Sequence, residues 1–140
     1  MNAAFSTLEK VMLIYQARST KSYDIPLMEQ PARPKKLLFL DVGLMNYQMG
    51  IQNNYVGLTD LNDFYRGQIA EQVTGQNILS HYEYDLPKIL YWARDKSEGI
   101  AELDFCLVHQ GRIIGIEVKS GQTSKLRSLF SFAQIVKNPI

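Results

Sequence analysis

Hydrophobic and polar positions divide the chain into a short series of helix-like and strand-like segments. Near the N-terminus, Phe5, Leu8 and Met12 recur at helical spacing. Ser6 and Glu9 stand three residues apart, which is the spacing of a helix capping box. The pattern therefore predicts a first helix that begins near Ser6.

The following segments change from polar to apolar. Residues 12–17 are also compatible with a strand, which leaves the end of the first helix open. Residues 18–36 hold three of the five prolines and many polar side chains, which predicts a strand-and-loop wing or a linker. The apolar run 37–42 predicts a buried strand or an extended segment that enters a domain, and residues 44–49 predict one or two helical turns that end at Gly50.

A longer helix is predicted over residues 61–81. Its apolar positions recur every four residues, at Tyr65, Ile69 and Val73. Glu71 lies on nearly the opposite side, between Gly67 and Gly75. Two glycines around one carboxylate indicate that another backbone comes close to this side, because glycine is otherwise unfavourable inside a helix. The alternative is an exposed glutamate on a polar helix face.

The second half of the chain predicts three strands and a closing amphipathic helix. Residues 89–94, 101–109 and 112–119 have strand character, and a helix capped by Thr123 or Ser124 is predicted to end near Asn138. In the middle strand, one face is predicted to carry Leu103, Phe105 and Leu107, and the other Glu102, Asp104, Cys106 and Val108.

Gln110-Gly111 reads as the two-residue turn of a β-hairpin. In such a hairpin His109 opposes Arg112 and Cys106 opposes Gly115. Counting further inward, Asp104 opposes Glu117, and Glu102 opposes Lys119. The two-residue period then places Asp104, Glu117 and Lys119 on one surface, provided that the turn has this length.

Two directly opposed carboxylates repel each other unless solvent, a lysine or a divalent cation compensates. Asp104, Glu117 and the backbone carbonyl of Val118 would form an oxygen site of the kind that Mg²⁺ prefers. Lys119 would then lie beside a substrate phosphate, which is an arrangement for phosphodiester hydrolysis. The alternative is a solvated charged ladder in which Glu102 and Asp104 form ordinary ion pairs with Lys119.

Composition excludes several classes of function. The 140 residues carry a formal net charge of +1 and a single cysteine, so an intrachain disulfide and a cysteine zinc cage are excluded. The chain lacks a phosphate-binding loop for ATP hydrolysis, a membrane-length apolar run and a signal peptide. A soluble cytoplasmic protein is expected. Basic residues that could contact a phosphate backbone are Lys35, Lys36, Arg66, Arg94, Lys125 and Arg127, although such residues are more often solvated surface.

Glu71, Asp104 and Glu117-Val118-Lys119 resemble, in this order, the acidic and lysine positions of the PD-(D/E)XK nucleases. More closely, the chain resembles the C-terminal domain of unknown function of a prokaryotic family of AAA+ ATPases. The segments that carry this resemblance are L-D-V-G-L at 40–44, G-x-x-x-E at 67–71, Tyr91-Trp92, E-x-D-F at 102–105 and I-E-V-K-S-G at 116–121.

The resemblance implies an α/β fold with a restriction-endonuclease-like core of helix, three strands and helix. Residues 1–36 would be a partial winged-helix segment, and residues 37–140 a nuclease-like domain that lacks its last strand. The chain would be a fragment or a truncated copy without its ATPase module, and the uncovered sheet would favour self-association.

The resemblance also implies a catalytic set of Glu71, Asp104, Glu117 and Lys119 that uses Mg²⁺ or Mn²⁺ to hydrolyse nucleic acid. Asp104 and Glu117 would be metal ligands, and Glu71 would complete or orient the site. The alternatives are a non-catalytic module that binds DNA or a protein, and a structural remnant with no activity of its own.

Overall fold

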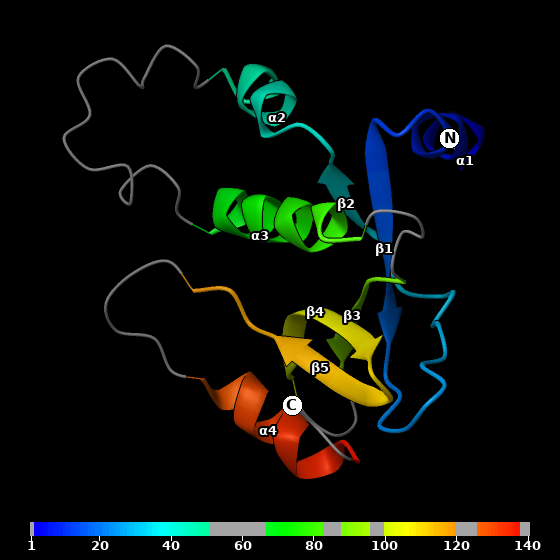
Figure 1. Cartoon of the computed structure of the whole chain (residues 1–140), viewed down its shortest axis with the longest axis vertical. Helices are drawn as coiled ribbons and strands as arrows, with labels where there is room; N and C mark the ends of the chain where they lie inside the picture. The colour runs from blue at the N-terminus through cyan, green and yellow to red at the C-terminus, as the bar shows by residue number, and fades with distance from the viewer. Residues whose placement is uncertain (1, 51–66, 83–87, 96–99, 120–125, 138–140) are drawn as a thin grey trace, which may run out of the picture.

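The computed structural model describes residues 2–50, 67–82, 88–95, 100–119 and 126–137, which form a mixed α/β fold (Figure 1). In this part of the chain, one sheet has five strands in the order β2-β1-β3-β4-β5. The elements are α1 (Asn2–Lys10), β1 (Ile14–Thr20), β2 (Lys36–Phe39), α2 (Val42–Gln48), α3 (Gln68–Ser80), β3 (Leu90–Ala93), β4 (Glu102–His109), β5 (Arg112–Ile116) and α4 (Arg127–Ile135). The predicted α/β class is confirmed.

β1 lies inside the sheet rather than in a separate unit. It pairs antiparallel with β2, where Ile14 lies opposite Phe39, and parallel with β3, where Arg18 lies opposite Leu90. β1 belongs to the segment that the sequence assigns to the winged helix, residues 1–36. The boundary at residue 36 therefore divides the chain within one sheet.

The first helix begins earlier than predicted. α1 already includes Ala3 and Ala4, which are strong helix formers, so Ser6 lies inside the helix and the capping-box prediction is wrong. The Glu9 carboxylate instead contacts β1, where Oε1 accepts from the Gln16 backbone N–H at 3.0 Å and Oε2 accepts from Gln16 Nε2 at 2.6 Å. These bonds hold α1 against the start of the sheet.

Each face of the sheet is covered by a helix, and Figure 1 shows α3 on one side and α4 on the other. On the α3 side, the buried core consists of Leu38, Leu79, Ile89 and Phe105. On the α4 side, Phe132 packs edge-to-face against Trp92 with ring centroids 5.4 Å apart. Gly115 lies beneath Phe132, where an added Cβ would come within 2.4 Å of the ring. The hydrophobic core is thus split into two layers by the sheet.

The predicted hairpin between β4 and β5 is confirmed. Gln110 and Gly111 have φ values of 49° and 73°, the left-handed conformations that a tight two-residue turn requires. His109 lies opposite Arg112, and the paired register ends at Phe105 opposite Ile116. The predicted pair Asp104–Glu117 would be the next step, which lies beyond the end of β5.

A register shift in β4 changes which face its residues take. Leu90 lies opposite Cys106 and Trp92 opposite Leu103, so two steps along β3 correspond to three along β4. This is the geometry of a β-bulge, which turns one extra residue to the same face as its neighbour. Leu103 consequently packs with Cys106 on the α4 side while Phe105 packs on the α3 side. The predicted alternation of Leu103 and Phe105 on one face is wrong for this reason.

The helix predicted over residues 61–81 corresponds to α3, and its part before residue 67 lies outside the described residues. Gly67 is the residue before the helix, with a φ of 62°, and not an interior position. The buried face is formed by Ile69, Gln72, Gly75 and Leu79. Gly75 faces the side chains of Leu38 and Phe105, so the close approach expected at this glycine involves side chains and not another backbone.

The remaining helices agree with the sequence within a few residues. α2 begins after Asp41, whose carboxylate accepts from the Gly43 N–H at 2.6 Å, and it ends just before Gly50 as predicted. α4 is present, and its predicted caps Thr123 and Ser124 lie outside the described residues. In the described part of the chain, none of the helices combines the length and the apolar character required to traverse a bilayer.

Candidate functional site

Three carboxylates from two elements converge on one ammonium group. Lys36 Nζ, at the start of β2, lies 3.0 Å from Glu71 Oε1, 3.1 Å from Glu102 Oε1 and 3.4 Å from Asp104 Oδ1. The same ammonium lies 5.2 Å from the centre of the Tyr91 ring. We call Lys36, Glu71, Glu102 and Asp104 the Lys36 cluster.

Buried contacts hold the elements of the Lys36 cluster in place. The side-chain amide of Gln72 forms hydrogen bonds with the backbone of β2, in the way that a neighbouring strand would. Its Oε1 accepts from the Phe39 N–H at 2.8 Å, and its Nε2 donates to the Leu37 carbonyl at 2.7 Å. This fixes the first turn of α3, and with it Glu71, against β2. The β4 bulge places Glu102 and Asp104 on the side of the sheet that α3 covers, so that they face Glu71 and Lys36. Hydrogen bonds from the Gln72 side chain to the β2 backbone, together with the β4 bulge, therefore position the cluster.

Charge in the Lys36 cluster is only partly balanced, because one ammonium faces three carboxylates. Burial alone would lower the pKa of Lys36, but hydrogen bonds and charges from Glu71 and Glu102 outweigh it and raise this pKa. Burial raises the pKa of Glu71, and the charges of Asp104 and Glu102 raise it further against the opposing effect of Lys36. The anionic partners of Lys36 therefore outweigh the cost of its burial. For Glu71, by contrast, the charge of Lys36 does not offset burial and the two neighbouring carboxylates.

The predicted residues Glu117, Val118 and Lys119 form an adjacent group. Lys119 Nζ makes a close ion pair with the largely buried Glu117 carboxylate, and this hydrogen bond raises the pKa of Lys119. Asp104 Oδ2 accepts from the Val118 N–H at 2.8 Å. Asp104 therefore joins the two groups, with one carboxylate oxygen at Lys36 and the other at the backbone after β5.

The structure brings together part of the predicted site. Glu71 and Asp104 meet as expected, although through Lys36. Glu117 and Lys119 pair with each other, and Glu102 pairs with Lys36 rather than with Lys119. Sequence reasoning treated Lys36 only as a general phosphate contact. Its place at the start of an apolar strand facing three carboxylates becomes visible only once the order of the strands is known.

Carboxylate oxygens are suitable ligands for Mg²⁺ or Mn²⁺, and the Lys36 cluster supplies one from each of Glu71, Glu102 and Asp104. The position between these oxygens is occupied by the Lys36 ammonium. In the described ranges, no three Asp, Glu, His or Cys side chains are grouped so that they could hold a metal ion. The oxygen donors are of the type that a divalent cation takes, but in this arrangement they hold the Lys36 ammonium, and a metal could bind only if Lys36 moved aside and the carboxylates rearranged.

Comparison with protein families matches residues 66–139, more than half of the 140-residue chain, to the model described as "Domain of unknown function (DUF4143)". The chain belongs to the DUF4143 family. No curated protein and no solved structure matches significantly. Within this DUF4143 chain, the matched range contains Glu71, Glu102, Asp104, Glu117 and Lys119, whereas Lys36 precedes it.

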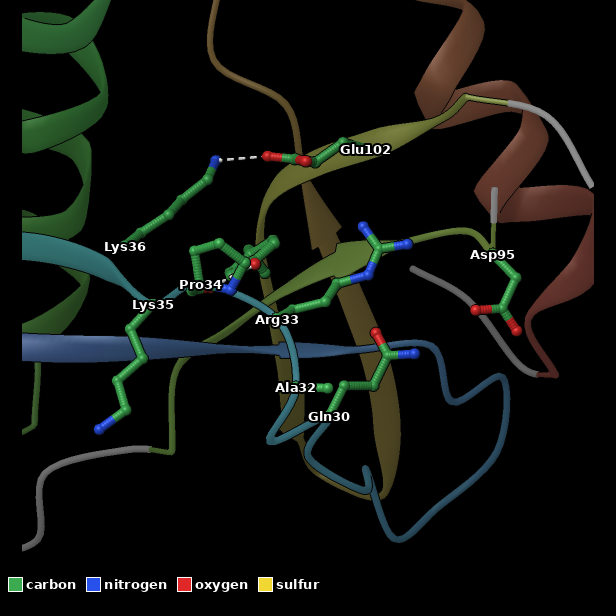
Figure 2. Close-up of a pocket in the computed structure, with 9 residues that line it drawn as sticks. Gln30, Ala32, Arg33, Pro34, Lys35, Lys36, Asp95 and Glu102 are labelled. Carbon is green, nitrogen blue, oxygen red and sulfur yellow. Dashed lines mark hydrogen bonds and ion pairs between the residues drawn. The ribbon is translucent and has the colours of Figure 1, made fainter. Parts of the chain in front are cut away.

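Two clefts meet at the cluster of this DUF4143 chain. An open groove of about 800 Å³ has Lys36 and Glu102 at one end and Arg33 and Asp95 at the other (Figure 2). A smaller cleft of about 330 Å³ is lined by Lys36 and Glu71 on the α3 side. The side chains of Lys36 and Asp104 remain 24% and 21% exposed. The charged groups are therefore accessible from the surface.

Proposed function

We propose that this DUF4143 chain is a nuclease-like domain that hydrolyses phosphodiester bonds of nucleic acid with Mg²⁺ or Mn²⁺. The observation that carries the proposal is the convergence of Glu71, Glu102 and Asp104 on a single cation position. Three carboxylates around one positive charge favour an additional or more highly charged cation, and divalent metals in such sites act on phosphate oxygens.

The order of elements supports a restriction-endonuclease-like core. α3, β3, β4, β5 and α4 follow the expected sequence of helix, three strands and helix. Glu71 lies in the first helix of this series, Asp104 in its second strand, and Glu117-Val118-Lys119 directly after the third. These are the positions at which the PD-(D/E)XK pattern has its acidic residues and lysine.

Each side chain has a role that follows from its surroundings. When bound, the metal would supply a Lewis acid for the phosphate and would lower the pKa of water. Glu71, Glu102 and Asp104 would hold the cation, and Glu117 would orient Lys119 through their ion pair. The Lys119 ammonium would stabilise negative charge that develops on the phosphate. Lys36 would keep the carboxylates together while no metal is bound.

We expect Mn²⁺ to bind wild type, and Asp104→Asn to weaken the affinity at least about tenfold, because one anionic ligand is lost. The amide oxygen can still accept from the Val118 N–H, so the fold should persist. Asp95→Asn is the matched control, since Asp95 pairs with Lys21 at 2.9 Å outside the Lys36 cluster. Isothermal titration calorimetry measures all three proteins, and equal affinities would contradict a site at Asp104.

The alternative function is a non-catalytic module that binds DNA or a protein on the same fold. Lys36 favours this alternative, because its ammonium already contacts all three carboxylates and forms an ion-pair network without a metal. The calorimetric titration separates the two functions. A folded wild type that binds no Mn²⁺ at millimolar concentration would support the interaction module.

A further inference from the structure

The larger groove separates opposite charges along its length. At one end is the Lys36 cluster, where carboxylates outnumber the ammonium. At the other end Arg33 donates from Nη2 to the carbonyl of Arg94 at 2.6 Å, and this acceptor is neutral. Asp95 also borders this end, where its carboxylate pairs with Lys21 at 2.9 Å and also interacts with the charge of Arg33, so two cations face one anion. The Arg33 end therefore keeps a positive charge beside the groove.

Hydrogen-bond donors gather at this positive end. A guanidinium has five N–H groups in a planar fork, and the bond to Arg94 uses only one of them. Gln30 Oε1 accepts from Ser19 Oγ at 2.9 Å, which leaves the amide Nε2 as a donor. Figure 2 shows the Gln30 amide beside the Arg33 guanidinium, with its oxygen on the side of Arg33 and its nitrogen on the side of Asp95. A planar fork with a neighbouring amide donor suits the oxygens of a phosphate group.

We propose that Arg33, assisted by Gln30, forms a subsite for the phosphate backbone of a nucleic-acid strand lying in this groove. The identity of the ligand rests on the proposed function. A strand with one phosphate at Arg33 places a neighbouring phosphate near the carboxylates, where a divalent cation would complete the charge balance. Arg33 and Lys36 are three residues apart, so their Cα atoms are separated by at most about 10 Å. The subsite thus positions the strand and takes no part in bond cleavage.

Binding of a short fluorescein-labelled single-stranded DNA, followed by fluorescence anisotropy in EDTA at low salt, tests the subsite. Arg33→Gln should weaken binding about tenfold. The slope of log affinity against log salt concentration should also fall by about the contribution of one phosphate contact. Arg112→Gln is the matched control, because Arg112 has the same side chain and charge as Arg33 but lies at the β4–β5 turn and does not line the groove. The Arg112→Gln variant should bind within about twofold of wild type.

Equal weakening in both variants, or no binding by wild type, would overturn the subsite. Should Arg33→Gln fail to fold, Arg33→Lys provides the test. This variant keeps the positive charge but loses the planar fork of N–H donors, so it should bind DNA about threefold more weakly than wild type. An unchanged affinity would overturn the proposal. Since EDTA removes divalent ions, a chain that binds no Mn²⁺ can still confirm the subsite. Conversely, DNA cleavage without any dependence on Arg33 would overturn the subsite alone.

Discussion

Lys36→Met is expected to lower the free energy of unfolding at neutral pH by about 2–3 kcal/mol. The variant keeps the length of the side chain but leaves Glu71, Glu102 and Asp104 facing each other without a counter-ion, and a partly buried charge that loses its partner is costly. The estimate lies below the cost for a fully buried pair because the Lys36 side chain is 24% exposed. Urea denaturation measures the difference between the two proteins.

The effect of Lys36→Met should depend on pH in a defined direction. Folding raises the pKa of Lys36, so its stabilising contribution is full below the ordinary lysine pKa and is lost as pH rises through the folded value. At the acidic end Glu71 takes up a proton, and its burial, with the charges of Asp104 and Glu102, raises the pKa at which this happens. The difference in the free energy of unfolding between Lys36→Met and wild type should therefore shrink as the pH falls towards about 4. Lys35→Met is the control, and an equal loss of stability in that variant would contradict the role of Lys36.

Gly115→Ala is expected to destabilise the fold by about 2 kcal/mol, because the new methyl group overfills the α4-side core. The added Cβ would lie 2.4 Å from Phe132 Cε1 and 2.7 Å from Leu103 Cδ1. Phe132 is fully buried against Trp92, so its ring can move only if α4 shifts. Thermal and urea unfolding measure the loss.

Gly75→Ala is the matched comparison for this prediction. Its Cβ would approach the terminal methyl groups of the buried Leu38 at 2.8 and 3.0 Å and Phe105 Cζ at 3.2 Å, so the displacement required is smaller than at Gly115. Alanine also favours the helix by up to about 1 kcal/mol over glycine, so the net change should stay within about 1 kcal/mol. If Gly115→Ala were as well tolerated as Gly75→Ala, the tight packing of α4 on β5 would be contradicted.

Local patterns in the sequence were sufficient to predict most elements. The Gln110-Gly111 turn and the apolar alternation around it gave the correct pairing of His109 with Arg112 and of Cys106 with Gly115. Strand and helix positions elsewhere agreed within a few residues, because each element has a short-range signal. The start of α1 was one exception, since two alanines extend the helix beyond the cap that Ser6 suggested. β1 was another, because the sequence left residues 12–17 open between helix and strand and assigned residues 18–20 to the wing or linker.

The candidate site depended on long-range features that the sequence does not display. A strict two-residue period cannot reveal a bulge, and the bulge in β4 places Glu102 and Asp104 on the same side of the sheet as Phe105 and Glu71. The contact with Lys36 depends on β2 lying at the edge of the sheet beside β1, which joins segments far apart in the chain. Glu71 and Asp104 were therefore found from the sequence, whereas the cation between them was not.

Hydrolysis of DNA by the intact chain tests the proposed role of the Lys36 cluster most directly. Labelled single- and double-stranded DNA would be incubated with Mg²⁺, Mn²⁺ or EDTA, and the products separated on a denaturing gel. We expect cleavage by wild type and by Asp95→Asn in the presence of metal, and none by Asp104→Asn, by Lys119→Ala or in EDTA. Products from Asp104→Asn at the wild-type rate, or no product from a wild type that binds Mn²⁺ and DNA, would contradict the proposed function.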